Sequence, residues 1–80
     1  MRIHFYGKLA DSFGRICDLN LDNSCSLAEL KTLLSRTIPG AAELLQPGKV
    51  RACVDDVLVP DSALVRPGQT IEFFPPVSGG

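Results

Sequence analysis

The stretch SCSLAELKTLLSRTIPG, residues 24–40, predicts the helix around which the rest of the fold is built. Ser26 and Glu29 form the S-x-x-E pattern of a capping box, in which each side chain accepts a hydrogen bond from a free backbone N–H at the helix start. Apolar residues then recur at helical spacing and predict one apolar stripe, made of Leu27, Leu30, Leu33, Leu34 and Ile38. The helix should end at Pro39 and Gly40, because proline cannot continue a helix.

Two segments before this helix alternate between apolar and polar residues, as half-buried strands do. In residues 2–9, Ile3 and Phe5 share one face, and the opposite face carries Arg2, His4 and Tyr6. Residues 16–21 alternate in the same way. The segment ADSFGR between them holds the turn formers Asp, Ser and Gly. We therefore expect an antiparallel hairpin with a loop of about five residues.

Further strands and turns follow the helix. AAELLQ, residues 41–46, predicts a short helical turn, and KVRACV, residues 49–54, predicts a third strand. Asp55-Asp56 predicts a tight turn into VLV, residues 57–59. The last strand, TIEFF at residues 70–74, should place Ile71 and Phe73 on one face and Thr70, Glu72 and Phe74 on the other.

These elements predict an α+β fold with the order β-β-α-β-β-β. The economical arrangement is a mixed sheet of about five strands with one main helix packed across one face. Leu30, Leu33 and Leu34 of the helix stripe would then meet the apolar residues of the first and last strands, which are Ile3, Phe5, Ile71 and Phe73. This is the β-grasp, or ubiquitin-like, arrangement, in which the last strand lies parallel beside the first. We expect one domain over residues 1–74 and an extended tail over residues 75–80.

Length and charge exclude several classes of function. The chain has 80 residues, 45% of them hydrophobic, and a formal net charge of −1. No stripe of basic residues indicates a nucleic-acid surface, and no apolar run approaches the ~20 residues of a membrane span. The start, MRIHFYGKL, lacks the apolar region and cleavage site of a signal peptide. We expect a cytoplasmic protein that binds neither nucleic acid nor membrane.

The sequence offers no constellation typical of an enzyme or a metal site. Cys17, Cys25 and Cys53 fit neither a disulfide framework nor a metal knuckle, because their number is odd and their spacing wide. We interpret them as small buried or half-buried thiols, and a sulfur-handling role for one of them is the alternative. His4 is the only histidine, and no nucleophile or second base accompanies it. Asp55-Asp56 lacks the further ligands that a cation needs, so we predict no metal site.

The ending FFPPVSGG, residues 73–80, predicts an extended and narrow tail. Pro75 and Pro76 end strand pairing, because proline has no N–H, and they hold the chain extended. Gly79 and Gly80 have no side chains and can pass through a channel too narrow for other residues. The tail after the last strand contains no charged side chain. The α-carboxylate of Gly80 is therefore the candidate reactive group.

The sheet face opposite the helix is the candidate docking surface. His4, Tyr6, Arg51 and Phe74 should lie on it, together with Cys53. Tyr, Phe and Arg are the residue types that protein interfaces favour. An apolar patch on that face would indicate a partner.

The ending F-F-P-P-V-S-G-G resembles that of the small subunits of molybdopterin synthase, which are ubiquitin-like sulfur carriers. Further stretches are similar to that family: I-H-F-Y-G, Phe13-Gly14, V-R-A-C-V-D-D and R-P-G-Q-T-I-E-F-F-P-P. Two turns depart from its pattern, since Asp55 stands where Asn is common and Gln69-Thr70 where an acidic pair is common. Both departures lie away from the tail, so they bear on partner contacts rather than on the sulfur-carrying end.

The resemblance implies a cycle of sulfur transfer in the biosynthesis of the molybdenum cofactor. An ATP-dependent activating enzyme would adenylate the Gly80 carboxylate, and a sulfur donor would convert it to a thiocarboxylate. The carrier would then dock on the large synthase subunit, within a heterotetramer, and donate its sulfur to a pterin precursor. The residues that thread into that subunit would be Pro75, Pro76, Val77, Ser78 and Gly79. On this reading the chain is no enzyme on its own and binds no cofactor stably, because the activating enzyme uses the ATP.

Three other functions fit the same fold. A sulfur carrier of the thiamine pathway would share the fold and the Gly-Gly ending but have another partner. A protein modifier would join its C-terminus to lysines through an isopeptide bond, as ubiquitin does. A β-grasp binding module would use its tail for no chemistry. The P-P-V-S-G-G ending favours the molybdopterin pathway by resemblance.

Overall fold

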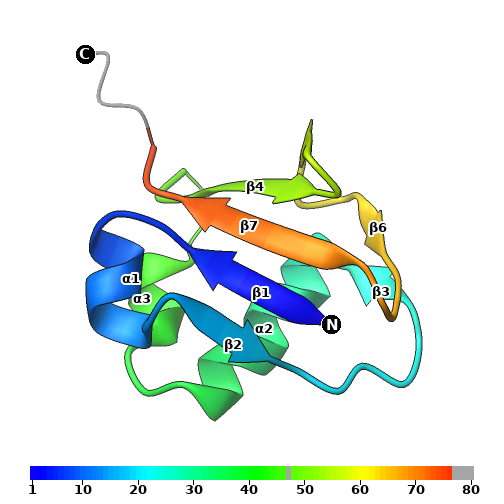
Figure 1. Cartoon of the computed structure of the whole chain (residues 1–80), viewed down its shortest axis with the longest axis horizontal. Coiled ribbons are helices and arrows are strands. Elements are labelled where there is room, and N and C mark those ends of the chain that lie inside the picture. The colour runs from blue at the N-terminus through cyan, green and yellow to red at the C-terminus, as the bar shows by residue number, and fades with distance from the viewer. Residues whose placement is uncertain (47, 77–80) are drawn as a thin grey trace.

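A mixed five-stranded sheet with one helix across its inner face forms the body of the protein (Figure 1). The structure is a computed structural model that describes residues 1–46 and 48–76. The sheet consists of β1 (Arg2–Phe5), β2 (Ile16–Asp18), β4 (Arg51–Val54), β5 (Val57–Val59) and β7 (Thr70–Phe74). Three of these strands are shorter than the segments 2–9, 16–21 and 49–54 that the sequence predicts.

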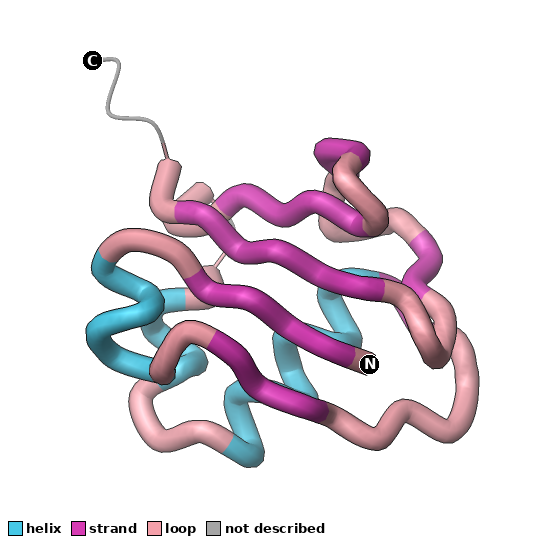
Figure 2. Tube along the Cα trace, in the orientation of Figure 1, coloured by secondary structure: helices cyan, strands magenta, loops and turns pink. Residues whose placement is uncertain are grey.

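The strand order, β2-β1-β7-β4-β5, puts the last strand of the chain in the centre of the sheet (Figure 2). β7 runs parallel to β1, with Phe5 paired to Phe73, and antiparallel to β4, with Arg51 paired to Phe74. The predicted β-grasp fold is thus confirmed, including the parallel contact between the first and last strands. Because β7 is flanked on both sides, the backbone that follows it leaves from the middle of the sheet.

The predicted helix is α2 (Leu27–Thr37), and its capping box is present. The Glu29 N–H donates to Ser26 Oγ at 3.1 Å, and the Ser26 N–H donates to Glu29 Oε1 at 3.1 Å. The helix ends before Pro39, where the Ile38 N–H donates to the Leu34 carbonyl at 2.8 Å. The predicted short turn after it is α3 (Ala41–Leu44).

The inner face of α2 differs from the predicted stripe at one position. Leu27, Leu30 and Leu34 are fully buried, but Leu33 is 36% exposed. Positions 27, 30, 31 and 34 follow the i, i+3, i+4, i+7 spacing of a single face, and position 33 falls beside it. Lys31 occupies the one position of this face that is not a leucine. Its side chain is buried, and its Nζ donates to Asp61 Oδ1 at 2.6 Å. The prediction that Leu33 meets the sheet is therefore wrong.

The loop predicted between the first two strands is a helix, α1 (Lys8–Phe13). Leu9 is buried, and Phe13 packs edge-on against Phe5 with ring centroids 5.1 Å apart. Leu9 and Phe13 are i and i+4 neighbours on a helix, so packing on the core stabilises a helical turn in spite of its Asp and Ser. The prediction of a hairpin loop of about five residues is wrong, while the antiparallel pairing of β1 with β2 is confirmed.

A second, two-stranded sheet is absent from the predicted element order. β3 (Cys25–Ser26) and β6 (Leu64–Val65) pair antiparallel, with Cys25 opposite Val65. Two residues are too few to show the alternation from which a strand is recognised. This small sheet joins the start of α2 to the segment before β7.

The Asp55-Asp56 turn between β4 and β5 is confirmed as a tight hairpin. Both residues have positive φ, 48° and 69°, as a two-residue turn between twisted strands requires. Asp55 also accepts hydrogen bonds from the Thr70 N–H and from Gln69 Nε2, each at 3.1 Å. Its carboxylate therefore joins this turn to the one that precedes β7.

Candidate functional site

The outer face of the sheet carries the four predicted docking residues, His4, Tyr6, Arg51 and Phe74. Their chain neighbours Ile3, Phe5, Ala52 and Phe73 are all buried against α2 or the core. Because strand side chains alternate between faces, the four point away from the helix. Strand pairing brings two of them together directly, since Arg51 is the register partner of Phe74.

Tyr6 and Phe74 form a stacked pair at the end of β1 and β7. Their ring centroids are 4.8 Å apart and the planes differ by 6°. Tyr6 Oη donates a hydrogen bond to Glu72 Oε2 at 2.9 Å. This bond to the carboxylate is the main reason that the pKa of the Tyr6 phenol lies above its ordinary value. The pair is a preformed aromatic surface that is 40% exposed at Tyr6.

Apolar residues of the edge strands extend this surface. Ile16 is 52% exposed and lies opposite His4, and Leu58 is 58% exposed and lies opposite Cys53. Neither is among the predicted docking residues, although the same alternation along β2 and β5 would have pointed to them. Interfaces gather exposed apolar side chains of this kind in the middle of a polar rim.

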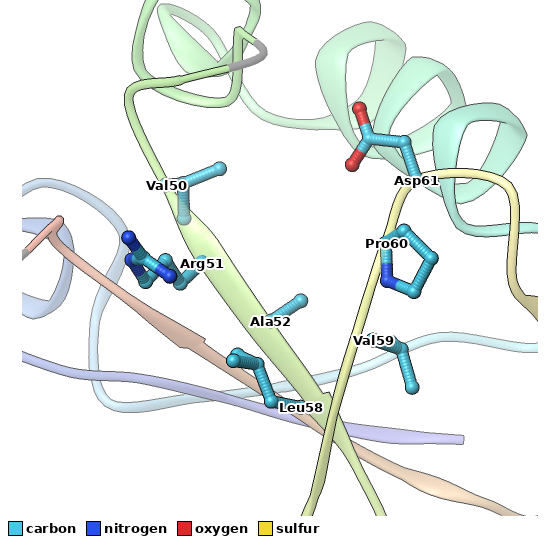
Figure 3. A pocket seen from close by; sticks show the side chains of 7 residues that line it. All are labelled: Val50, Arg51, Ala52, Leu58, Val59, Pro60 and Asp61. Atoms are coloured by element: carbon cyan, nitrogen blue, oxygen red, sulfur yellow. The ribbon is translucent and has the colours of Figure 1, made fainter.

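A shallow hollow lies beside β4 and β5 at the border of this surface. Figure 3 shows Arg51 and Leu58 on one side of β4, and Val50 and Ala52 on the other. Pro60 and Asp61 close the hollow toward α2. The Arg51 side chain is thus exposed beside Leu58, where a guanidinium can pair with a carboxylate of a partner.

The base of the tail rests against a glycine that the sequence prediction does not include. Gly7 has φ 60° and ψ −136°, and a Cβ added to it would stand 2.7 Å from Pro75 Cγ. Phe5 pairs with Phe73, and the same offset places Tyr6 beside Phe74 and Gly7 beside Pro75. The similar segments IHFYG and IEFFP, once aligned as parallel neighbours, would have revealed the contact.

The structure describes only the first two residues of the predicted tail. Pro75 is half-buried and Pro76 is exposed, and neither is part of a strand. The candidate reactive residue Gly80 and the predicted threading residues Val77, Ser78 and Gly79 lie outside the described residues. Their roles stay predictions.

Other candidate groups give no second site within residues 1–46 and 48–76. In this part of the chain no three side chains of His, Cys, Asp or Glu gather as a metal site would require. Cys17, Cys25 and Cys53 are free and half-buried, as predicted. Burial is the main cause that raises the pKa of the Cys25 thiol, and the negative charge of Glu29 is the second. A raised pKa disfavours the reactive thiolate. Across the same described ranges, no helix is long and apolar enough to cross a membrane.

Comparison with known proteins gives the family. The sequence matches the ThiS family over residues 3–80, which includes the whole of β7 and the tail. The chain belongs to the ThiS family. As a ThiS-family protein it is a small ubiquitin-like sulfur carrier or modifier rather than a catalytic enzyme, and carriers of this family work with activating and sulfurating enzymes.

Solved structures share the fold of this ThiS-family protein. The HVO 2177 protein of Haloferax volcanii has a TM-score of 0.80 at 19% identity, over 99% of this chain and 84% of that one. Small archaeal modifier protein 1 of H. volcanii has a TM-score of 0.78 at 15% identity, over 95% of each chain. The thiamine biosynthesis protein ThiS of Geobacter metallireducens has a TM-score of 0.57 at 18% identity, over 100% of both chains. No curated protein matches the sequence significantly.

Proposed function

We propose that this ThiS-family protein carries sulfur as a thiocarboxylate on Gly80 and delivers it to a pterin precursor in molybdenum cofactor biosynthesis. The observation that carries the sulfur-carrier part of the proposal is the family match, which extends through the tail to residue 80. The central strand β7 leads directly into that tail. The proposal takes Gly80 as the C-terminal residue of the protein in the cell.

The chemistry needs two enzymes and no catalytic group of this chain. A carboxylate is a poor acyl donor until its oxygen becomes part of a good leaving group. The activating enzyme transfers AMP from ATP to the Gly80 carboxylate and releases pyrophosphate. Hydrosulfide delivered by the sulfur donor then attacks the acyl carbon and displaces AMP, which leaves the thiocarboxylate and releases a proton. In the later transfer, the thiocarboxylate sulfur bonds to a carbon of the pterin precursor in place of an oxygen, which leaves. Water then attacks the acyl carbon, breaks its bond to sulfur and restores the carboxylate.

The outer face is the surface that we propose for docking, first on the activating enzyme and later on the large synthase subunit. The Tyr6–Phe74 stack stands beside the tail base, and Arg51 lies next to Phe74 in the strand register. Buried aromatic and arginine side chains supply most of the binding energy in typical interfaces. A large synthase subunit that covers this face would receive the tail in its own pocket, where we place the catalytic groups. In the heterotetramer that we propose, each small subunit would contact a large subunit through this face.

Two alternatives each have an observation in their favour. The ThiS structure of G. metallireducens matches along its full length, which favours a carrier for thiamine synthesis. Small archaeal modifier protein 1 matches with a higher TM-score, which favours a protein modifier. The P-P-V-S-G-G ending is our reason for preferring the molybdopterin pathway.

The decisive measurement is the intact mass of the protein purified from its native host. Exchange of one terminal oxygen for sulfur supports the carrier function, and a variant without Gly80 serves as the control. Repeated failure to form the thiocarboxylate with the host's activating enzyme, ATP and a sulfur donor would contradict it. Co-purification with a molybdopterin synthase large subunit would distinguish the molybdenum pathway from the thiamine pathway. Conjugates on lysines of other proteins, lost without Gly80, would favour the modifier.

A further inference from the structure

Gly7 and Pro75 meet where the sheet ends and the tail begins. The Tyr6 N–H donates to the Phe73 carbonyl at 3.1 Å, which extends the pairing of β1 and β7 by one residue. Tyr6 then stacks on Phe74. The next pair in this register is Gly7 with Pro75, at the point where β1 turns into α1 and β7 gives way to the tail. Figure 1 shows α1 and the end of β7 at the same end of the molecule.

Position 7 favours glycine for two separate reasons. Its φ of 60° with ψ of −136° is a backbone conformation that residues with a side chain rarely adopt. An added Cβ would also stand 2.7 Å from Pro75 Cγ and 3.4 Å from Pro75 Cδ. The first reason concerns the turn into α1, whereas the second concerns only the contact with Pro75.

Gly14, at the other end of α1, separates these two reasons. It has φ 83° and ψ 169°, so it also favours glycine for its backbone. A Cβ added to Gly14 would meet nothing within 4 Å. Gly7 and Gly14 thus share the conformational requirement, and of the two only Gly7 has a neighbour in the tail.

We propose that Gly7 is a positioning residue, which seats the ring of Pro75 and so sets the direction in which the tail leaves the sheet. This inference rests on the proposed sulfur-carrier function. The proline ring fixes its own φ, so its seat against Gly7 sets the path of the chain at the start of the tail. A carboxylate presented in one direction from the docking face reaches the adenylating site at a lower entropic cost than one that must search.

The test is a double-mutant cycle on adenylation. Wild type, Gly7→Ala, Pro75→Ala and the double variant are assayed with the activating enzyme by ATP–pyrophosphate exchange, and their affinity for that enzyme is measured by calorimetry. Gly7→Ala should lower kcat by roughly tenfold to a hundredfold, the scale of a misplaced reacting group. Its dissociation constant should stay close to that of wild type, because the docking face is unchanged. Gly14→Ala is the matched control and should keep the wild-type kcat.

The coupling between positions 7 and 75 is the critical result. Alanine lacks the Cγ and Cδ atoms that an added Cβ at position 7 would meet. In the Pro75→Ala background, Gly7→Ala should therefore have little further effect on kcat. An equal effect in both backgrounds, or an equal loss in Gly14→Ala, would assign the defect to backbone strain and overturn the proposal. So would a wild-type kcat for Gly7→Ala.

Two further outcomes are distinguishable from these. If wild type itself is not adenylated, the proposed function fails, whatever the role of Gly7. If Gly7→Ala does not fold, Pro75→Ala alone decides. Because Pro75 and Pro76 both hold the tail extended, Pro76→Ala is then the control. A larger fall in kcat for Pro75→Ala than for Pro76→Ala, at unchanged dissociation constants, supports the contact with Gly7. An equal fall or a wild-type kcat overturns it.

Discussion

At the scale of single residues, the capping box of α2 makes stability depend on pH. The hydrogen bond from the Ser26 N–H lowers the pKa of the Glu29 carboxyl below its ordinary value of 4.5, and the Ser26 side chain lowers it further. A carboxyl whose pKa is lowered by folding stabilises the fold above its unfolded pKa, and this contribution is lost as pH falls through the folded pKa. Part of the stability that the protein loses at acid pH should therefore come from protonation of Glu29.

We expect Glu29→Gln to be less stable than wild type at neutral pH. Glutamine keeps the shape and can still accept the hydrogen bond, so only the charge is removed. The difference between the two proteins should be constant at neutral pH, shrink as pH falls below 4.5, and vanish once Glu29 is protonated in the folded state. Urea unfolding of both proteins between neutral pH and about pH 3 measures it. A difference that does not change with pH would contradict the assignment.

Tyr6 allows the stacked ring to be separated from the hydroxyl. Tyr6→Ala removes the ring from Phe74 and should weaken binding to the activating enzyme by roughly tenfold or more, as loss of an aromatic anchor does. Tyr6→Phe keeps the ring and loses only the hydrogen bond to Glu72, so its affinity should stay within a few-fold of wild type. Calorimetric titration of the three proteins checks this. Wild-type affinity of Tyr6→Ala would exclude the stack from the interface.

The outer-face residues can be predicted from the sequence, whereas Gly7 cannot be predicted as readily. Alternation with a period of two is a local property of each strand, so His4, Arg51 and Phe74 are assigned to one face without knowledge of the fold. The contact of Gly7 with Pro75 depends on the register between strands from opposite ends of the chain. That register appears in the sequence only after the fold is assumed.

At the scale of elements, the position of a leucine in the helical repeat decides whether α2 buries it. Leu34 is fully buried and Leu33 is 36% exposed. Leu34→Ala should lower the free energy of unfolding by about 2–5 kcal/mol, and Leu33→Ala by about 0.5 kcal/mol. Denaturant unfolding of the two variants measures the difference. Equal losses would place the face of α2 one position further round the helix.

Element prediction succeeds where an element has a long pattern or a strong terminal signal. α2 has a capping box, a stripe and a Pro-Gly end, and its predicted start and end are correct. α1 has one turn of apolar spacing and two turn-forming residues, so its helix depends on Leu9 and Phe13 packing on the core. β3 and β6 are held by pairing with each other rather than by a local pattern.

At the scale of the whole molecule, the fold and the proposed chemistry lie in separate parts of the chain. In the described ranges, the buried core contains no residue beyond Phe73. Phe73 is fully buried and stacks on Phe5 with ring centroids 5.8 Å apart. Stability and sulfur loading should therefore respond to different changes.

Deletion of Gly80 should abolish thiocarboxylate formation and leave the melting temperature nearly unchanged, because the core stays intact. Phe73→Ala should do the reverse. Removal of an aromatic side chain from the core lowers the free energy of unfolding by about 3–5 kcal/mol, out of a total of roughly 4–12 kcal/mol for a domain of this size. The molecules that stay folded at low temperature still have the reactive end. Thermal unfolding and mass measurement after incubation with activating enzyme, ATP and sulfur donor test both variants. A fall of several degrees on deletion of Gly80 would show that the tail contributes to the folded core, and thiocarboxylate formation without Gly80 would move the reactive carboxylate elsewhere.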